Sequence, residues 1–509
     1  MKMKYLKRIF ISFLLLAVIG LGVIMWVNGQ LKRAHGAYTG LVNTKNLLEP
    51  TPHLIIKNVN ILSQDSKEFI ANQNVTLKDG IITSIHKDRV DSNSNIKIVD
   101  GTNKYLIPGL VDSHVHLKES KNDLLLYLAN GVTHIREMSG STEHLKWKRS
   151  IEQGELGPRI YVASEKVNSK SGISGIFNSW TRRRINYASE EDAIKKIQWL
   201  HKEGFEAVKI GSFVNSEMHN YTVREAKKYD IPVIGHIPYS IGLDSIYKSG
   251  QCEFAHIEEI TKQLIRQFGR ITTDNKDEFI QYILENCDAV SSRLRENNIA
   301  VSTTVWLMES FIGQKFNLDT YIKEVELEYA NPGLIEGTKL GRGWLPGNNS
   351  YAEVDEIMND EKLLANSKSF WTTYIQAIHI MLKSLVKNDV LIMAGTDANV
   401  PIAIPGFSLH DELESLSKVG MTNSQVLYSA TVAPGIWMKT KTGIIKEGYC
   451  ADLVLLSNNP LENIKNTKSI EIVFSGKYQI KKKDIDQILQ EVVHKNNDSR
   501  SIDITSYIN

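Results

Sequence analysis

The chain has 509 residues, which is too many for one small domain and enough for a large barrel with an accessory module. Its formal net charge is +2, with 42% hydrophobic and 23% charged residues. This balance is ordinary for a globular protein and provides no basic field for nucleic acid. The three cysteines, Cys252, Cys287 and Cys450, lack the spacing of zinc ligands, and we expect no disulfide.

The first 30 residues predict a membrane segment. A basic start is followed by an uncharged apolar run over residues 9–27, which as a helix is long enough to cross a bilayer. The run is longer than the core of a usual signal peptide and lacks an Ala-x-Ala cleavage site. We therefore expect an uncleaved signal anchor that holds the catalytic part outside the cytoplasmic membrane, in the periplasm or the extracellular space. Secretion after cleavage is the alternative.

The two flanks of the chain have β character. Residues 53–107 contain short apolar runs separated by turn signals such as Lys78-Asp79-Gly80. This piece is too small to close a core, and β character returns over residues 439–479. We expect both parts to build one small β-sandwich. The polar tail, residues 480–509, carries no further signal.

Between the flanks, residues 108–438 alternate strand and helix patterns, which predicts a parallel sheet. The count fits an α/β fold of the (β/α)8 TIM-barrel type, whose chemistry lies at the carboxyl ends of the strands. We expect an insertion at about residues 307–364 to cover the site as a lid, with a peripheral or oligomer-contact role as the alternative. The eight candidate strands are residues 110–116, 132–137, 159–163, 207–210, 233–236, 254–257, 300–306 and 390–394.

Two histidines, His114 and His116, lie two residues apart on the first candidate strand. A strand places such residues on one face, so both imidazoles can serve one metal ion. Imidazole is a common ligand for zinc. For an isolated His-x-His pair, two hydrogen-bonded histidines are an equally good interpretation, and the rest of the chain has to decide.

Four further residues lie at the ends of candidate strands four, five, six and eight: Lys209, His236, His256 and Asp397. A lysine inside an apolar strand must be paired or deprotonated, because burial of an ammonium group is costly. A neutral amine can add carbon dioxide, and the resulting carbamate can bridge two metal ions. Asp397 can bind metal and accept a proton from metal-bound water. Six such residues at strand ends favour a metal site over core histidines.

These motifs resemble the amidohydrolase superfamily, and in particular its branch of imidazolonepropionase-like enzymes and Xaa-Pro dipeptidases. The resemblance implies two zinc ions that share a hydroxide and the carbamate of Lys209, and a small β-sandwich made from both chain ends. The long insertion and the membrane segment depart from the family pattern. The resemblance covers roughly residues 53–478 and rests on residues 108–116, 131–136, 235–236, 255–258, 395–398, 408–413, 429–434, 451–456 and 459–461.

We therefore expect a zinc-dependent hydrolase that cleaves a C–N bond in a dipeptide or N-acyl amino acid by a metal-activated hydroxide. Asp397 would carry the proton, with Glu258 as the next candidate base. Tyr239 would donate a hydrogen bond to the oxyanion and His410 would contact substrate, although packing roles are the alternatives. One of the three arginines at residues 182–184 would hold a substrate carboxylate, unless they form a solvated loop.

Other functions fit the same scaffold. Hydrolysis of a cyclic, imidazolone-like amide and deamination use the same metal site, so the sequence does not separate them. A non-catalytic binding protein on the same barrel is disfavoured, because all six ligand types are retained. The sequence leaves the oligomeric state open, a homo-oligomer included.

Overall fold

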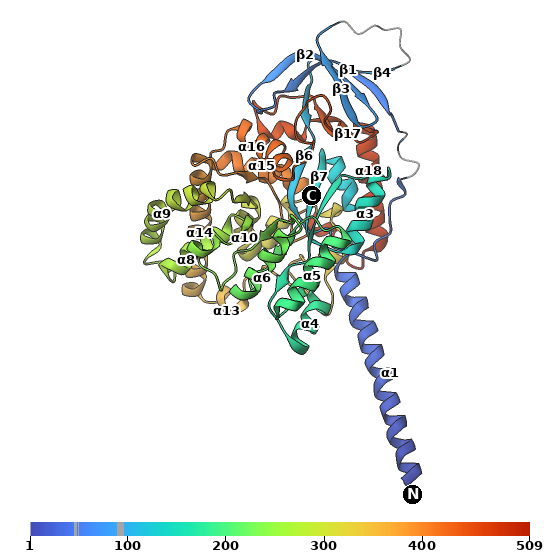
Figure 1. Ribbon diagram of the computed structural model, residues 1–509, viewed down its shortest axis with the longest axis vertical. Coiled ribbons are helices and arrows are strands. Elements are labelled where there is room, and N and C mark those ends of the chain that lie inside the picture. The colour runs from blue at the N-terminus through green and yellow to red at the C-terminus, as the bar shows by residue number, and fades with distance from the viewer. Residues whose placement is uncertain (1, 45–47, 49, 89–95, 509) are drawn as a thin grey trace.

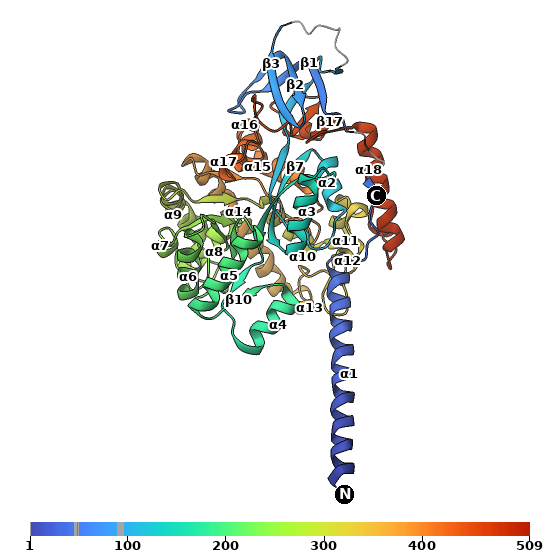
Figure 2. The same ribbon diagram turned by 45° about the vertical axis from the view of Figure 1, so that its right-hand side comes forward.

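The structure is a computed structural model that describes residues 2–44, 48, 50–88 and 96–508. Helix α1 (Lys2–Ala34) projects from one end of the globular part, and a β layer lies at the other end (Figures 1 and 2). Among the described residues, one helical stretch, Tyr5–Ala34, is long and apolar enough to cross a membrane. The most apolar part of this helix is not covered by the rest of the chain.

The β layer is one eight-stranded sheet to which both flanks of the chain contribute. Its order is β18-β17-β16-β5-β1-β2-β3, with β4 also paired to β1. The flanks meet in the antiparallel pair of β16 and β5, where Val454 lies opposite Ile107. The two flanks therefore pair as expected, within a single mixed sheet that has its own apolar core. The strands are β1 (His53–Leu62), β2 (Phe69–Lys78), β3 (Ile81–His86), β4 (Lys97–Asp100), β5 (Tyr105–Pro108), β16 (Leu453–Leu456), β17 (Ile470–Ser475) and β18 (Tyr478–Lys481).

The central part of the chain forms two parallel sheets, as the alternating pattern predicted. One has the order β6-β7-β8, and the other has the order β10-β9-β11-β12-β13-β14-β15. All eight candidate strands are present among the described residues. The strands are β6 (Leu110–Val115), β7 (Val132–Gly140), β8 (Arg159–Ser164), β9 (Val167–Asn168), β10 (Ile185–Asn186), β11 (Val208–Ile210), β12 (Val233–Gly235), β13 (Gln251–Ala255), β14 (Ala300–Ser302) and β15 (Ile392–Met393).

Two isolated bridges connect the parallel sheets. Val115 at the end of β6 pairs with Ala398 beyond β15, and Ala163 in β8 pairs with Ala207 just before β11. Both bridges are parallel, so the strand direction is continuous from one sheet to the other. The carboxyl ends of the strands are thereby gathered on one side of the molecule.

Helices surround the parallel strands and bury the largest apolar core against them. Helix α5 illustrates the local signals, because Ser189 caps its start and Gly204 ends it in a left-handed conformation. The helices that follow α1 are α2 (Asp123–Ala129), α3 (Thr142–Glu152), α4 (Gly172–Arg182), α5 (Glu190–Glu203), α6 (Ser216–Lys227), α7 (Leu243–Ile246), α8 (Glu258–Phe268), α9 (Lys276–Glu296), α10 (Val305–Phe316), α11 (Leu318–Tyr321), α12 (Pro332–Glu336), α13 (Asp355–Met358), α14 (Glu361–Lys387), α15 (Phe407–Val419), α16 (Asn423–Ser429), α17 (Val432–Trp437) and α18 (Lys482–Ser499).

The seventh strand is shorter than the predicted range 300–306. It ends at Ser302, and α10 begins at Val305. Thr304 between them has a φ of 73°, which turns the chain out of the extended conformation. The Glu412 carboxylate of α15 then accepts hydrogen bonds from the backbone N–H groups of Val305 (3.1 Å) and Trp306 (2.7 Å). Glu412, more than a hundred positions away, thus fixes the start of α10. The local sequence pattern does not reveal this contact.

Candidate metal centre

The first part of the site is formed where β6 meets the segment that follows β15. His114 lies near the end of β6, and His116 lies one residue beyond it. The backbone N–H of Asp397 donates to the carbonyl of His114 at 2.8 Å, and that of His116 donates to the carbonyl of Ala398 at 3.1 Å. These bonds hold Asp397 beside both histidines, although 283 residues separate it from His114 along the chain.

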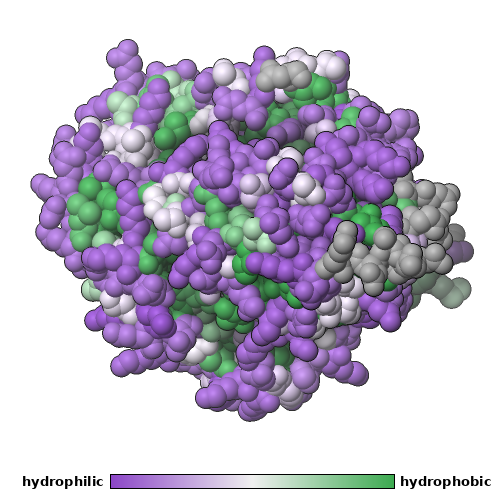
Figure 3. Space-filling model, turned by 90° about the horizontal axis from the view of Figure 1, so that it is seen from above, coloured by the Kyte–Doolittle hydropathy of each residue, from purple (hydrophilic) through white to green (hydrophobic). Residues whose placement is uncertain are grey.

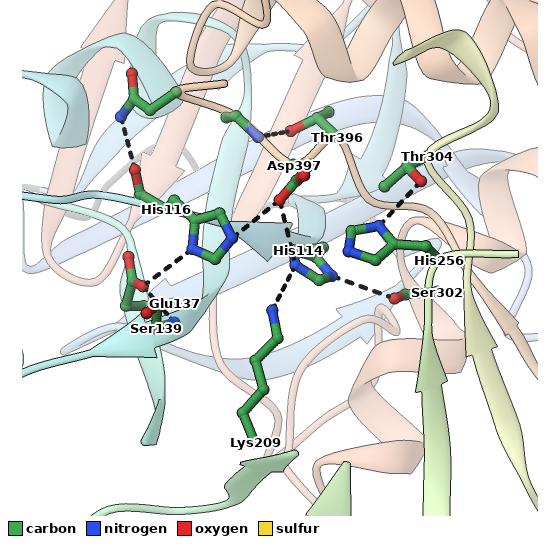
Figure 4. A network of polar contacts seen from close by, with 12 residues as sticks. His114, His116, Glu137, Ser139, Lys209, His256, Ser302, Thr304, Thr396 and Asp397 are labelled. Atoms are coloured by element: carbon green, nitrogen blue, oxygen red, sulfur yellow. Dashed lines mark hydrogen bonds and ion pairs between the residues drawn. The ribbon is translucent and has the colours of Figure 1, made fainter. Parts of the chain in front are cut away.

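The three side chains form a group that could hold a metal ion. Oδ1 of Asp397 lies 3.3 Å from Nε2 of His114 and 3.0 Å from Nε2 of His116 (Figure 4). The ligand atoms of the three residues lie within 4.8 Å of one another. Two imidazole nitrogens and one carboxylate oxygen are ligands that zinc accepts.

Lys209 enters this group from β11. Its Nζ lies 2.8 Å from Nε2 of His114, and the side chain is fully buried (Figure 4). Burial, followed by the charge of nearby Lys166, holds the pKa of Lys209 well below its usual value. This shift favours the neutral amine, which is the form that can add carbon dioxide.

His256 and His236 follow β13 and β12 and complete the set. The His256 ring centroid lies 4.2 Å from that of His114 and 5.4 Å from that of His236. His256 has a φ of 80° and Asp397 one of 58°, both in the left-handed region that non-glycine residues rarely adopt. Such strained backbones occur often at functional sites. The structure thus brings together all six residues that the sequence predicted as ligands.

The four histidines share one arrangement, in which Nδ1 faces a side-chain oxygen. In His114, His236 and His256 a hydrogen bond occupies Nδ1, which leaves Nε2 for a ligand, and such outer partners are typical of metal-binding histidines. Nε2 of His236 is buried and has no hydrogen-bond partner in the described part of the chain. The oxygens facing Nδ1 belong to Ser302 for His114 (3.5 Å), Glu137 for His116 (3.7 Å), Ser212 for His236 (2.9 Å) and Thr304 for His256 (3.1 Å).

The protonation states suit cation binding. Burial lowers the pKa of His236 to about 4 and holds the pKa values of His114 and His256 well below 6.5. Burial alone would raise the pKa of Asp397, but His116 and His256 outweigh it and hold that pKa well below its usual value. At neutral pH these three imidazoles are therefore neutral, and Asp397 is ionised.

Two buried carboxylates support the ligands and were not identified from the sequence. Asp112 accepts hydrogen bonds from Oγ1 of Thr396 at 2.6 Å and from the backbone N–H of His114 at 3.2 Å. Glu137 of β7 faces His116 and accepts from the backbone N–H of Leu117. Asp112 could have been identified from the sequence, because a carboxylate inside an apolar strand needs hydrogen-bond partners.

The remaining candidates are not among the six clustered residues, and each has contacts of its own. Tyr239 follows His236 by three residues, is 46% exposed and packs on Phe213. Glu258 starts α8 and pairs with Lys262 at 2.7 Å. Arg183 pairs with Glu119.

His410 lies at the other end of the strands. It is buried on α15, with Nδ1 2.9 Å from Oγ1 of Thr467 and Nε2 3.1 Å from the carbonyl of Asn130. Asn130 lies two residues before the start of β7, so His410 lies at the amino ends of the strands. The structure therefore gives it a packing role, and the expected substrate contact at the carboxyl ends is not found.

Comparisons with known proteins agree with these features. The family described as the amidohydrolase family matches residues 105–477. An adenine deaminase of Clostridium perfringens is 25% identical over 206 residues, or 38% of this chain and 35% of that protein. This chain thus matches about a third of that relative's length.

Solved structures show the same fold at low identity. A bottromycin amidohydrolase is 17% identical, with a TM-score of 0.67 over 91% of this chain and 96% of that chain. A Xaa-Pro dipeptidase with bound methionine in its active site is 16% identical, with a TM-score of 0.58 over 84% of this chain and all of that chain.

Proposed function

The chain belongs to the amidohydrolase family, as its motifs predicted, and from this premise we propose a zinc-dependent hydrolase that cleaves an amide bond to an amino acid. The family indicates a hydrolase of carbon–nitrogen bonds. The single observation that carries the finer proposal is that six ligand-type side chains cluster at one side of the strands, namely His114, His116, His236, His256, Lys209 and Asp397.

The donor set fits a pair of zinc ions. His114 and His116 with Asp397 would hold one ion, and His236 and His256 would hold the other. In its neutral form the Lys209 amine would add carbon dioxide and release one proton, and the resulting carbamate would help to hold both ions. The unpartnered Nε2 of His236 supports this proposal, since a buried polar atom without a partner is costly.

When bound, zinc would supply a water of lowered pKa and would polarise the scissile carbonyl. The proton chemistry belongs to Asp397. Both of its histidine contacts use Oδ1, which leaves Oδ2 to accept the water proton and pass it to the leaving nitrogen. Its low pKa keeps the carboxylate ionised and ready for that transfer. Tyr239 would donate a hydrogen bond to the developing oxyanion.

Cationic side chains favour a substrate with a free carboxylate, such as a dipeptide or an N-acyl amino acid. Lys166 follows β8 at the carboxyl ends, and burial lowers its pKa to about 8. Arg184 is close enough to contribute to that shift. At neutral pH both groups are largely charged and can attract an anion.

The similarity to an adenine deaminase favours one second candidate, the deamination of an adenine-like ring. The same metal site and the same proton carrier would serve it. The two candidates differ in product, because deamination releases ammonia whereas amide hydrolysis releases an amino acid.

The architecture and location that we propose follow the sequence prediction. The two bridges support one closed (β/α)8 barrel over residues 108–438, flanked by a β module from residues 53–107 and 439–479. The uncovered apolar helix supports an uncleaved anchor that places the barrel outside the cytoplasmic membrane. Residues 307–364 would then lie over the carboxyl ends as a cover for the site.

The decisive experiment uses the full chain in lipid nanodiscs with its metal content measured. Dipeptides, N-acyl amino acids, adenine and a cyclic imidazolone are offered in turn. We expect release of an amino acid, loss of turnover after chelation and recovery with zinc. Ammonia release from adenine without amide cleavage would establish the second candidate. A chain that binds no metal and turns over no substrate would contradict both.

A further inference from the structure

Helix α4 presents its apolar side to the outside. Ile173, Ile176 and Phe177 are 87%, 73% and 59% exposed, and helical spacing places them on one face. The opposite face, with Gly175 and Asn178, is buried against the protein. A surface helix of a water-exposed protein normally has the reverse orientation, with its apolar stripe toward the core.

This helix is attached to α1 at the point where α1 leaves the globular part. Nε1 of Trp180 donates to Oδ1 of Asn28 at 2.7 Å. Asn28 directly follows the apolar run 9–27, so this bond lies where a membrane span would end. Tryptophan is enriched at that depth, because its ring is apolar and its N–H is polar. In both views α4 extends from the globular part in the direction of α1 (Figures 1 and 2).

Other exposed rings emerge on the same side. Phe213, just beyond β11, is 67% exposed, and its ring centroid lies 5.5 Å from that of Tyr239. The carbonyl of Phe213 accepts from the backbone N–H of Ser169, three residues before α4. A backbone hydrogen bond thus links the segment before α4 to the loop that follows β11 at the carboxyl ends of the strands. The opposite end of the molecule is mostly hydrophilic, with apolar side chains in small groups (Figure 3).

We propose that α4 is an interfacial helix, which inserts Ile173, Ile176 and Phe177 into the outer lipid layer of the membrane that α1 crosses. The proposal rests on the membrane anchor of the proposed function. Helices of this kind bury their apolar face at the boundary between headgroups and acyl chains. Attachment through both α1 and α4 fixes the orientation of the globular part, so that the carboxyl-end side faces the bilayer.

The test measures lipid exposure of α4 in the full chain. Ile176→Cys receives a nitroxide label in a chain in which Cys252 and Cys450 are replaced by serine, because Cys287 is buried. Leu284→Cys, 51% exposed on α9, is the matched control. In nanodiscs, collision rates are measured with oxygen, which concentrates in lipid, and with a water-soluble nickel chelate. We expect a several-fold higher oxygen-to-nickel ratio at residue 176 than at residue 284.

Equal ratios at the two positions would overturn the proposal. A label at residue 176 that neither reagent reaches would also overturn it, because protein, such as a second copy, would then cover α4. N-terminal sequencing of the same sample shows whether α1 is present, and a cleaved chain would likewise overturn the proposal. The measurement needs no turnover, so an inactive chain with a lipid-exposed α4 would count against the proposed function alone.

Discussion

At the scale of residues, burial determines the protonation states of the ligand side chains in the metal-free protein. Metal binding normally requires proton loss from its ligands, which makes the affinity depend on pH. Here burial already keeps His114, His236 and His256 neutral near pH 7, while Asp397 is ionised. Uptake of a cation therefore displaces no proton from these groups at neutral pH. The addition of carbon dioxide to Lys209, by contrast, releases one.

Lys209 gives the first prediction at this scale. Lys209→Ala should lose metal and nearly all turnover, because it removes the group that forms the carbamate. A short carboxylic acid added to this variant should restore part of the activity, since its carboxylate can occupy the same space. Lys209→Arg, the control, should stay inactive with the acid, because its guanidinium remains charged and fills the space. Full activity of Lys209→Ala without added acid would contradict the carbamate.

The second prediction concerns Asp397 as the proton carrier. Asp397→Asn keeps the shape of the side chain but removes its capacity to accept a proton. Turnover should fall by about 10²–10⁴-fold, the usual contribution of acid–base catalysis. Metal content should fall less than in His114→Ala, because an amide oxygen still coordinates weakly. Steady-state kinetics together with metal analysis check this. If turnover stays at the wild-type rate, another base acts, and Glu258→Gln is the next variant to measure.

At the scale of elements, the segment after β15 is fixed against β6 by close backbone contact. Ser113 donates its backbone N–H to the carbonyl of Ala394 at 2.9 Å. A Cβ at Gly395 would lie 2.9 Å from both the backbone N and the Cβ of His114, and this strand backbone has no room to move. Gly395 is therefore required for the approach that sets Asp397 beside the histidines.

Gly395→Ala should push this segment away from β6 and separate Asp397 from His114. We expect metal affinity and kcat/KM to fall at least tenfold, or about 1.4 kcal/mol, while the chain stays folded. Gly242→Ala is the matched control, because no atom lies within 4 Å of its added Cβ. Metal titration with circular dichroism separates loss of the site from loss of the fold. Unchanged metal affinity in Gly395→Ala would refute the argument.

The sequence predicted the strands and their six terminal side chains because both depend on local order. A polar residue that closes an apolar run identifies the carboxyl end of a strand, as at Lys209 and Asp397. The partners of these residues could not be predicted, because contacts such as Asp112 with Thr396 join segments 284 residues apart. His410 was misjudged for the same reason, since nothing local shows that α15 directs it to Asn130 at the amino ends.

At the scale of the whole molecule, buried neutral histidines make stability depend on pH. Burial lowers the pKa of His410 to about 3, against 6.5 in the unfolded chain. Between these values the unfolded chain binds the proton and the folded chain does not, so the stability present above pH 6.5 is lost as the pH falls toward 3. The free energy of unfolding should fall by roughly 1.4 kcal/mol per pH unit for this group.

His410→Gln should reduce the dependence of the free energy of unfolding on pH by about 1.4 kcal/mol per pH unit between pH 6 and pH 4. Chemical denaturation at several pH values measures it. His201→Gln, at an exposed position on α5, is the matched control for the loss of one histidine. An unchanged slope in His410→Gln would mean that His410 does not stay neutral in the folded chain. The readout is the slope, so any constant loss of stability in the variant does not interfere.

The pairing of β5 with β16 has a consequence for biosynthesis. Pro108 lies opposite Leu453, so one edge of the first five strands stays open until roughly 345 more residues have been made. At about 5–20 residues per second this interval is about 20–70 s. An unpaired strand edge invites association with other chains. The nascent protein therefore spends most of its synthesis with an incomplete half-sheet, and we expect its yield to depend on chaperones that shield such edges during that time.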